Sequence, residues 1–181
     1  MSHLPPNIKN ELGLVHVYTG DGKGKTTASL GLAFRAAGRG LEVLMIQFLK
    51  PPEDYGEHIS ASRMNNFTIL PLGLDHMVSK VPKKEDVAVS EAALAKAKGL
   101  MHSGAYDLVI LDEINVAVSW GLLSAGKVLD VLKNRPPNTE VVLTGRGAPP
   151  EIIEYADLVT EMRPLKHPFD KGVHARMGIE F

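Results

Sequence analysis

The chain contains no cysteine among its 181 residues, and only 6% of its residues are aromatic. Without thiols, the protein cannot form disulfides, thiolate zinc ribbons or iron–sulfur ligation, and it cannot use a cysteine nucleophile. Their absence is also compatible with a reducing cytoplasm. The scarcity of aromatic side chains argues against a surface that stacks the bases of single-stranded nucleic acid.

Neither sign of charge dominates, because 20 lysines and arginines face 21 aspartates and glutamates and leave a formal net charge of −1. Such a balance provides no global basic field for a nucleic-acid partner. No apolar run approaches the roughly 20 residues that span a bilayer. The first 12 residues have neither the basic nor the apolar region of a signal peptide. We therefore expect a cytoplasmic protein with no nucleic-acid or membrane partner.

The length fits one domain, which we expect over residues 13–181 after a short tail at 1–12. Short apolar runs alternate with helical patterns, which is typical of βαβ units and a parallel sheet. The stretch from 50 to 66 is rich in turn residues. A short helical or irregular piece is expected at 115–121, and a short helix after Pro149-Pro150. Strands are predicted at 14–18, 43–49, 67–70, 108–111, 141–144 and 158–162, and longer helices at 25–37, 86–102 and 124–134.

A glycine-rich segment lies between the first predicted strand and the first helix: Gly20-Asp21-Gly22-Lys23-Gly24-Lys25-Thr26-Thr27. Glycines let backbone N–H groups turn inward and form an anion-binding nest at the positive end of a helix. Lys25 would reach phosphates as a point charge, Thr26 would offer its hydroxyl to Mg²⁺, and Lys23 adds a second cation. The usual G-x-x-x-x-G-K-[ST] pattern has its first glycine where this chain has Thr19. The segment predicts a three-layer α/β/α P-loop (RecA-like) fold with a mostly parallel sheet of about five or six strands.

Two carboxylates, Asp112 and Glu113, follow the apolar run that ends at Leu111. Open α/β sheets bind ligands at the carboxyl ends of their strands, where such residues hold Mg²⁺ directly or through water. Alone, the pair is equally consistent with a helix cap, but the phosphate loop favours a metal site. Glu113 has two open roles, as a metal ligand or as the group that orients a water for ATP hydrolysis.

Three further side chains are candidates for ligand contact. Arg146, between two glycines at a strand end, is expected to contact triphosphate or ribose. Arg35 lies on the helix after the phosphate loop, where a solvated face is as well supported as a ligand contact, and Asp21 fits a simple turn residue equally well. Trp120, with its neighbours Val116 and Val118, is predicted to form core or dimer contacts rather than a cofactor-binding surface.

Several motifs together resemble the P-loop ATP:corrinoid adenosyltransferases, which make the cobalt–carbon bond of adenosylcobalamin. The resemblance covers the chain from about Gly13 to Phe181, and the displaced first glycine of the phosphate loop is part of it. Its motifs are the phosphate loop, Gln47-Phe48-Leu49-Lys50, Leu111-Asp112-Glu113, Thr144-Gly145-Arg146-Gly147, and a C-terminal segment running from Arg163-Pro164-Leu165-Lys166-His167 to Met177-Gly178-Ile179.

The resemblance implies that a Co(I) corrinoid attacks the 5′ carbon of ATP and that the whole triphosphate leaves. It implies ATP bound with its phosphates reversed relative to ordinary P-loop enzymes. Lys25, Thr26 and Glu113 would be catalytic, and Mg²⁺ on Thr26, Glu113 and Asp112 would stabilise the leaving group. Co(I) is a strong nucleophile and needs no general base.

The resemblance also implies a homodimer and a flavoprotein reductant, and it leaves open whether the acceptor is cobalamin, cobinamide or an earlier acid such as cob(I)yrinic acid a,c-diamide. In better-known bacterial members, an aromatic pair after the third strand crowds the corrin ring. The matching positions here are Leu74 and His76. The sequence therefore leaves open how the corrinoid is activated for the reduction of Co(II). The alternatives are a P-loop ATPase or nucleoside kinase and a nucleotide-dependent switch, neither of which accounts for the Gly-Arg-Gly turn and the C-terminal motif.

Overall fold

The computed structural model describes residues 8–51, 55–73 and 82–180. Its centre is a six-stranded sheet in the order β3-β2-β4-β5-β1-β6, and every neighbouring pair of strands is parallel. The strands are β1 (Val15–Thr19), β2 (Val43–Gln47), β3 (Phe67–Pro71), β4 (Leu108–Asp112), β5 (Glu140–Thr144) and β6 (Leu158–Glu161).

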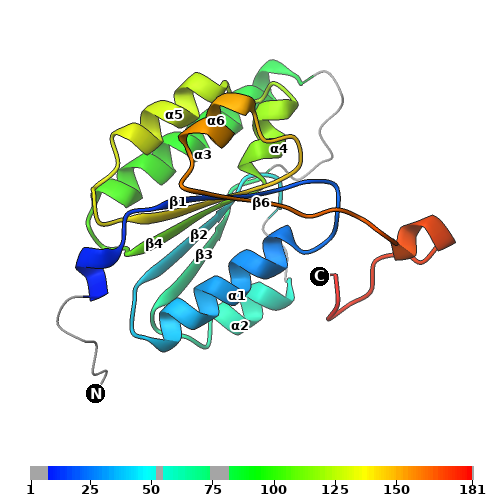
Figure 1. Ribbon diagram of the computed structural model, residues 1–181, viewed down its shortest axis with the longest axis horizontal. Coiled ribbons are helices and arrows are strands. Elements are labelled where there is room, and N and C mark those ends of the chain that lie inside the picture. The colour runs from blue at the N-terminus through cyan, green and yellow to red at the C-terminus, as the bar shows by residue number, and fades with distance from the viewer. Residues whose placement is uncertain (1–7, 52–54, 74–81, 181) are drawn as a thin grey trace.

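Helices cover both faces of the sheet, so the three-layer prediction is confirmed (Figure 1). Helices α1 and α2 pack on one face, whereas α3, α4, α5 and α6 pack on the other. Two short 3₁₀ helices, η1 and η2, lie near the two ends of the described chain. The helices are η1 (Ile8–Glu11), α1 (Lys25–Gly38), α2 (Gly56–Ala61), α3 (Lys84–His102), α4 (Ile114–Ser119), α5 (Ala125–Lys133), α6 (Pro150–Tyr155) and η2 (Pro168–Lys171).

The central strands are buried on both faces, which is why they appear in the sequence as nearly continuous apolar runs. Every residue of β2 and of β4 is buried. The edge strand β6 differs, since all four of its residues are exposed. Strand β5 lies between β1 and β4, so the carboxyl ends of these three strands open on the same end of the sheet.

Two local predictions were wrong. The stretch from 50 to 66 was interpreted as rich in turns, with no helix predicted, but it contains α2. Six residues beginning with a glycine are too short to show a helical apolar period, and isolated helices of this length are not stable without packing. The second strand was predicted through Leu49 but ends at Gln47, after which Phe48 and Leu49 form a bend.

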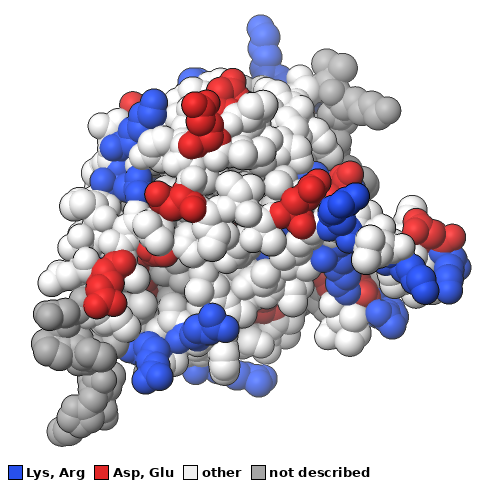
Figure 2. All heavy atoms as spheres, viewed as in Figure 1, with Lys and Arg blue, Asp and Glu red and all other residues white. Residues whose placement is uncertain are grey.

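The surface carries both signs of charge. On the face shown in Figure 2, acidic and basic side chains are interspersed over the body, and several basic ones lie along the C-terminal segment that projects from it. No helix in the described part of the chain is both long and apolar enough to cross a membrane.

Candidate active site

The phosphate loop connects β1 to α1 and needs its glycines for two reasons. Gly20 and Gly24 have φ angles of 92° and 121°, which side chains other than glycine rarely adopt. A Cβ atom on Gly20 or Gly22 would lie 2.5 or 2.7 Å from the carbonyl oxygen of Met162. The Gly22 N–H donates to this same oxygen at 2.7 Å. The loop is therefore fixed by the residue that follows β6.

Lys25 begins α1 with its side chain inside the loop. Its Nζ donates hydrogen bonds of 2.7 Å to the carbonyl oxygens of both Gly20 and Gly22, and the residue is only 7% exposed. Burial lowers the pKa of Lys25, and the nearby Glu113 carboxylate opposes that shift. The ammonium is thus held at the centre of the nest, where phosphate oxygens are the natural partners of a lysine in such a loop.

Asp112 is completely buried at the end of β4 and links three elements. Its Oδ1 accepts hydrogen bonds from Thr26 Oγ1 at 2.9 Å and from Thr144 Oγ1 at 2.7 Å. Its Oδ2 accepts one from Gln47 Nε2 at 3.3 Å. A buried carboxylate with this many donors is held in one orientation. It in turn orients the Thr26 hydroxyl next to Lys25.

Glu113 is the only residue other than glycine with a positive φ in the described part of the chain, at 61°. Its N–H donates to Thr144 Oγ1 at 2.9 Å, which helps to hold this conformation. Left-handed backbone at a bulky residue costs about 1–2 kcal/mol and is concentrated at functional sites. Burial raises the pKa of Glu113, and the neighbouring Asp112 carboxylate raises it further. The side chain faces the hollow described below.

The donor set suits a magnesium ion. Mg²⁺ prefers oxygen ligands and usually takes one or two carboxylates together with waters and substrate phosphates, rather than an all-protein cage. Thr26, Asp112 and Glu113 offer one hydroxyl and two carboxyl groups beside the phosphate loop. No group of three or more His, Asp or Glu able to hold a metal occurs in the described ranges.

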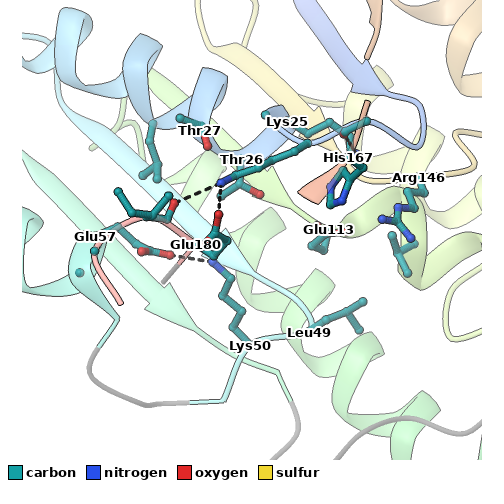
Figure 3. A pocket seen from close by; sticks show the side chains of 18 of the residues that line it. Lys25, Thr26, Thr27, Leu49, Lys50, Glu57, Glu113, Arg146, His167 and Glu180 are labelled. Atoms are coloured by element: carbon teal, nitrogen blue, oxygen red, sulfur yellow. Dashed lines mark hydrogen bonds and ion pairs between the residues drawn. The ribbon is translucent and has the colours of Figure 1, made fainter. Parts of the chain in front are cut away.

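Thr26, Glu113 and most of the phosphate loop border one hollow of about 700 Å³, which we call the phosphate-loop hollow (Figure 3). Its lining combines charged side chains with apolar ones. The cations are Lys23, Lys25, Lys50 and Arg146, the carboxylates are Glu57, Glu113 and Glu180, and the larger apolar side chains are Leu30, Leu49, Val116, Trp120 and Ile179. No cysteine, serine or aspartate is among the described lining residues, and the only imidazole is that of His167.

The C-terminal segment contributes part of this lining. After β6 the chain leaves the sheet, turns at η2 and comes back toward the phosphate loop (Figure 1). Lys23 Nζ donates to Glu180 Oε1 at 2.6 Å, and the Arg176 guanidinium also binds the Glu180 carboxylate. Hydrogen bonds from Arg176 and Lys23 lower the pKa of Glu180 to about 2. The ionised carboxylate of Glu180 therefore forms an ion pair with Lys23 of the phosphate loop.

Most of the residues predicted from sequence lie together. Residues 22–27, Glu113 and Arg146 line the hollow. Gly20 and Asp112 do not line it, but they accept hydrogen bonds from the lining residues Lys25 and Thr26. Gly145 sets Arg146 against α4, because a Cβ there would lie 2.9 Å from the Val116 nitrogen. Arg35 is exposed on α1 and is not among the lining residues. The exposed Asp21 does not line the hollow either, although its Oδ1 lies 3.9 Å from Arg146 Nε.

Leu74 and His76 lie outside the described residues. Sequence reasoning also missed several residues of the hollow. Trp120, predicted to form core or dimer contacts, is 45% exposed at its edge. Lys50 and Glu57 both line it and form an ion pair of 2.6 Å. Lys50 ends the Gln-Phe-Leu-Lys motif, which the sequence analysis identified without giving it a function. Glu57 lies on α2, the helix that was not predicted.

Comparison with known proteins gives consistent matches over nearly the whole chain. Residues 11–181 match the family described as ATP:corrinoid adenosyltransferase BtuR/CobO/CobP. A corrinoid adenosyltransferase of Sinorhizobium sp is 40% identical over 175 residues, which cover 95% of this chain and 82% of that protein. Corrinoid adenosyltransferase of Escherichia coli (strain K12) is 36% identical over 174 residues, 96% of this chain and 88% of the relative, and the same figures hold for corrinoid adenosyltransferase CobA of Salmonella typhimurium.

Among solved structures, the flagellar accessory protein FlaH from Methanocaldococcus jannaschii has a similar fold. The TM-score is 0.52 at 13% sequence identity, with 82% of this chain and 70% of that chain covered. At this identity the likeness concerns the fold alone. Together with the phosphate loop and the parallel sheet, it confirms the P-loop fold class predicted from the sequence.

Proposed function

The chain belongs to the ATP:corrinoid adenosyltransferase family, and we propose that it transfers the 5′-deoxyadenosyl group of ATP to the Co(I) centre of a corrinoid, with Mg²⁺ as cofactor. The electron pair of Co(I) forms a bond to the 5′ carbon of ATP. The bond between that carbon and the 5′ oxygen breaks, and triphosphate leaves with its electrons. This reaction serves the biosynthesis or salvage of adenosylcobalamin.

The observation that carries the proposal is that the lining of the phosphate-loop hollow combines cationic side chains with apolar ones. Lys23, Lys25, Lys50 and Arg146 suit a leaving group that gathers negative charge as the bond breaks. Leu49, Val116 and Trp120 suit the largely apolar face of a ring system. The nucleophile belongs to the substrate, so the chain has to provide only positioning and charge stabilisation.

Thr26, Asp112 and Glu113 would hold the magnesium ion, which when bound neutralises part of the triphosphate charge. Lys25 donates from the centre of the loop to the phosphate oxygens, exchanging its two carbonyl partners for them. Backbone N–H groups at the start of α1 add the positive end of the helix dipole. We further propose that the protein works as a homodimer and that a flavoprotein supplies the electron that reduces Co(II) to Co(I).

The test is to mix purified protein anaerobically with Mg-ATP and chemically reduced cob(I)alamin. The expected result is the light-sensitive chromophore of the cobalt–carbon bond, together with intact triphosphate in equal amount. Omission of the protein is the control for direct reaction, and cobinamide replaces cobalamin in a parallel sample. Release of ADP and single phosphate without a change in either corrinoid would overturn the proposal in favour of a P-loop ATPase.

A further inference from the structure

Gln47, the last residue of β2, is fully buried beside the candidate metal site. It is paired in register with Asp112, the last residue of β4. Side chains at paired positions of neighbouring strands project to the same face of a sheet. The Gln47 amide and the Asp112 carboxylate therefore lie next to each other where both strands end at the phosphate-loop hollow.

The amide of Gln47 has partners on both of its atoms. Nε2 donates to Asp112 Oδ2 and to Glu57 Oε1, each at 3.3 Å. Oε1 accepts a hydrogen bond from His58 Nε2 at 2.6 Å. The reversed amide would point its oxygen at two carboxylates, which are acceptors only when ionised. The surroundings thus impose one orientation on the side chain.

Through these bonds Gln47 joins two parts of the hollow that are far apart in the sequence. On one side, Asp112 Oδ1 accepts from the hydroxyls of Thr26 and Thr144. On the other side, Glu57 Oε1 accepts from Lys50 Nζ at 2.6 Å, and Figure 3 shows this pair in the hollow. Burial of Glu57 would raise its pKa, but the hydrogen bond and charge of Lys50, the backbone hydrogen bond at Glu57 and the hydrogen bond from Gln47 together lower it. Glu57 therefore carries negative charge when it accepts from Gln47.

We propose that Gln47 is a positioning residue, which fixes the Asp112 carboxylate, and through it the Thr26 hydroxyl, in the orientation that binds the metal–nucleotide complex. It does so by donating to Asp112 and Glu57 while His58 holds its oxygen. The effect on turnover rests on the proposed function, whereas the effect on metal binding does not. Neither a glutamate nor a methionine of similar size can replace it, since the first adds a third carboxylate and the second has no donor.

The experiment measures Mn²⁺ binding by electron paramagnetic resonance in the presence of an unreactive ATP analogue. For Gln47→Met we expect the affinity for Mn²⁺ to fall about tenfold to hundredfold, the usual effect of removing a side chain that orients a metal ligand. In the adenosyltransfer assay, kcat should fall while the KM for the corrinoid stays unchanged. Gln47→Glu should weaken Mn²⁺ binding as well, although it keeps the size and polarity of the side chain.

The matched control is Asn66→Leu. This side chain is also an amide at one end of the sheet, but it donates to the carbonyl oxygens of Ala37 and Leu41 and lies outside the hollow. Asn66→Leu should lower the melting temperature without changing Mn²⁺ affinity. A folded Gln47→Met protein with wild-type Mn²⁺ affinity would overturn the inference, as would an equal loss in the control. If the wild type makes no adenosylcorrinoid, only the proposed function fails, because the Mn²⁺ titration still decides the role of Gln47.

Discussion

Lys25 is the residue on which we expect phosphate binding to depend most. Its ammonium is buried and already bonded to two loop carbonyls, so phosphate oxygens meet a cation that is fixed in place. Hydrogen bonds to charged groups contribute about 1.5–3 kcal/mol. We therefore expect Lys25→Ala to weaken ATP binding about tenfold to hundredfold, as measured by isothermal titration calorimetry.

The control for Lys25→Ala is Lys98→Ala. Lys98 forms an ion pair of 3.0 Å with Asp130 on the surface and does not line the phosphate-loop hollow. Its removal should leave ATP affinity unchanged, since exposed ion pairs contribute little. Equal affinities of Lys25→Ala and wild type for ATP would contradict the placement of the nucleotide phosphates in the loop.

Glu113 makes the stability of the protein depend on pH. Burial and the Asp112 charge raise its pKa above the ordinary value, so the folded state binds a proton more tightly than the unfolded chain does. Its unfavourable effect on stability is therefore absent below the unfolded pKa of about 4.3, grows as the pH rises toward the folded pKa, and is complete above it. We expect Glu113→Gln to melt at a higher temperature than wild type at pH 7, by about 2–4 °C for each kcal/mol relieved.

The measurement is thermal unfolding of both proteins at pH 4 and pH 7 without nucleotide or divalent metal. The melting temperatures should agree at pH 4 and separate at pH 7. Glu151→Gln, which removes an exposed acid at the start of α6, provides the control and should show no such separation. A difference of equal size at both pH values would show that the carboxylate charge is not its cause.

At the scale of elements, the sequence predicted the strands because buried parallel strands have a visible apolar pattern. The same apolar pattern gave wrong interpretations for residues near the phosphate-loop hollow. Phe48 and Leu49 look like a continuation of β2, but Phe48 is a buried core residue beyond the end of the strand, and Leu49 lines the hollow. Trp120, predicted to form core or dimer contacts, lines the hollow as well. Apolar character alone does not distinguish these environments. The phosphate loop and Asp112-Glu113 were found because their spacing has a known chemical reason.

Contacts between distant residues leave no such local signal. Lys23 and Glu180 are separated by 157 positions, and Gln47 and Asp112 by 65. Their meeting depends on the strand order and on the path of the C-terminal segment, which turn chemistry and periodicity do not determine. The helix α2, which carries Glu57, was missed because its six residues are held by packing rather than by intrinsic preference.

The C-terminal segment places a carboxylate next to a lysine of the phosphate loop, since Lys23 Nζ lies 2.6 Å from Glu180 Oε1. We expect this carboxylate to compete with nucleotide phosphates for Lys23. We expect Glu180→Ala to strengthen ATP binding by up to about fivefold, the range of a partly exposed ion pair, and the gain should shrink at high salt. Titration calorimetry with ATP at two salt concentrations measures this.

Asp170→Ala is the control for that variant, because Asp170 is an exposed acid in η2 of the same segment and does not line the hollow. It changes the net charge by the same amount and should leave ATP affinity unchanged. Weaker ATP binding in Glu180→Ala would contradict competition and would instead assign Glu180 a supporting role for the loop.

For the whole molecule, the exposed β6 edge of the sheet is a surface with no partner among the described residues. Strand β6 pairs only with β1, and its four residues are exposed, with Leu158 at 40% and Val159 at 41%. Ile153 on the neighbouring α6 adds a further exposed apolar side chain. Uncovered apolar edge strands tend to pair with other chains, and proteins usually protect them with charges or by covering them. A homodimer that covers this edge would resolve the conflict.

We therefore expect the wild type to have twice the 19.6 kDa chain mass in solution, and Val159→Lys to have the mass of one chain. Light scattering after size-exclusion chromatography measures both. Val89→Lys, which places the same charge on an exposed valine of α3, should remain dimeric. Val159→Lys should still bind ATP, because the bond between Gly22 and Met162 that fixes the phosphate loop lies within one chain. A wild type that is monomeric at micromolar concentration, or a Val159→Lys protein that stays dimeric, would show that β6 is not the interface.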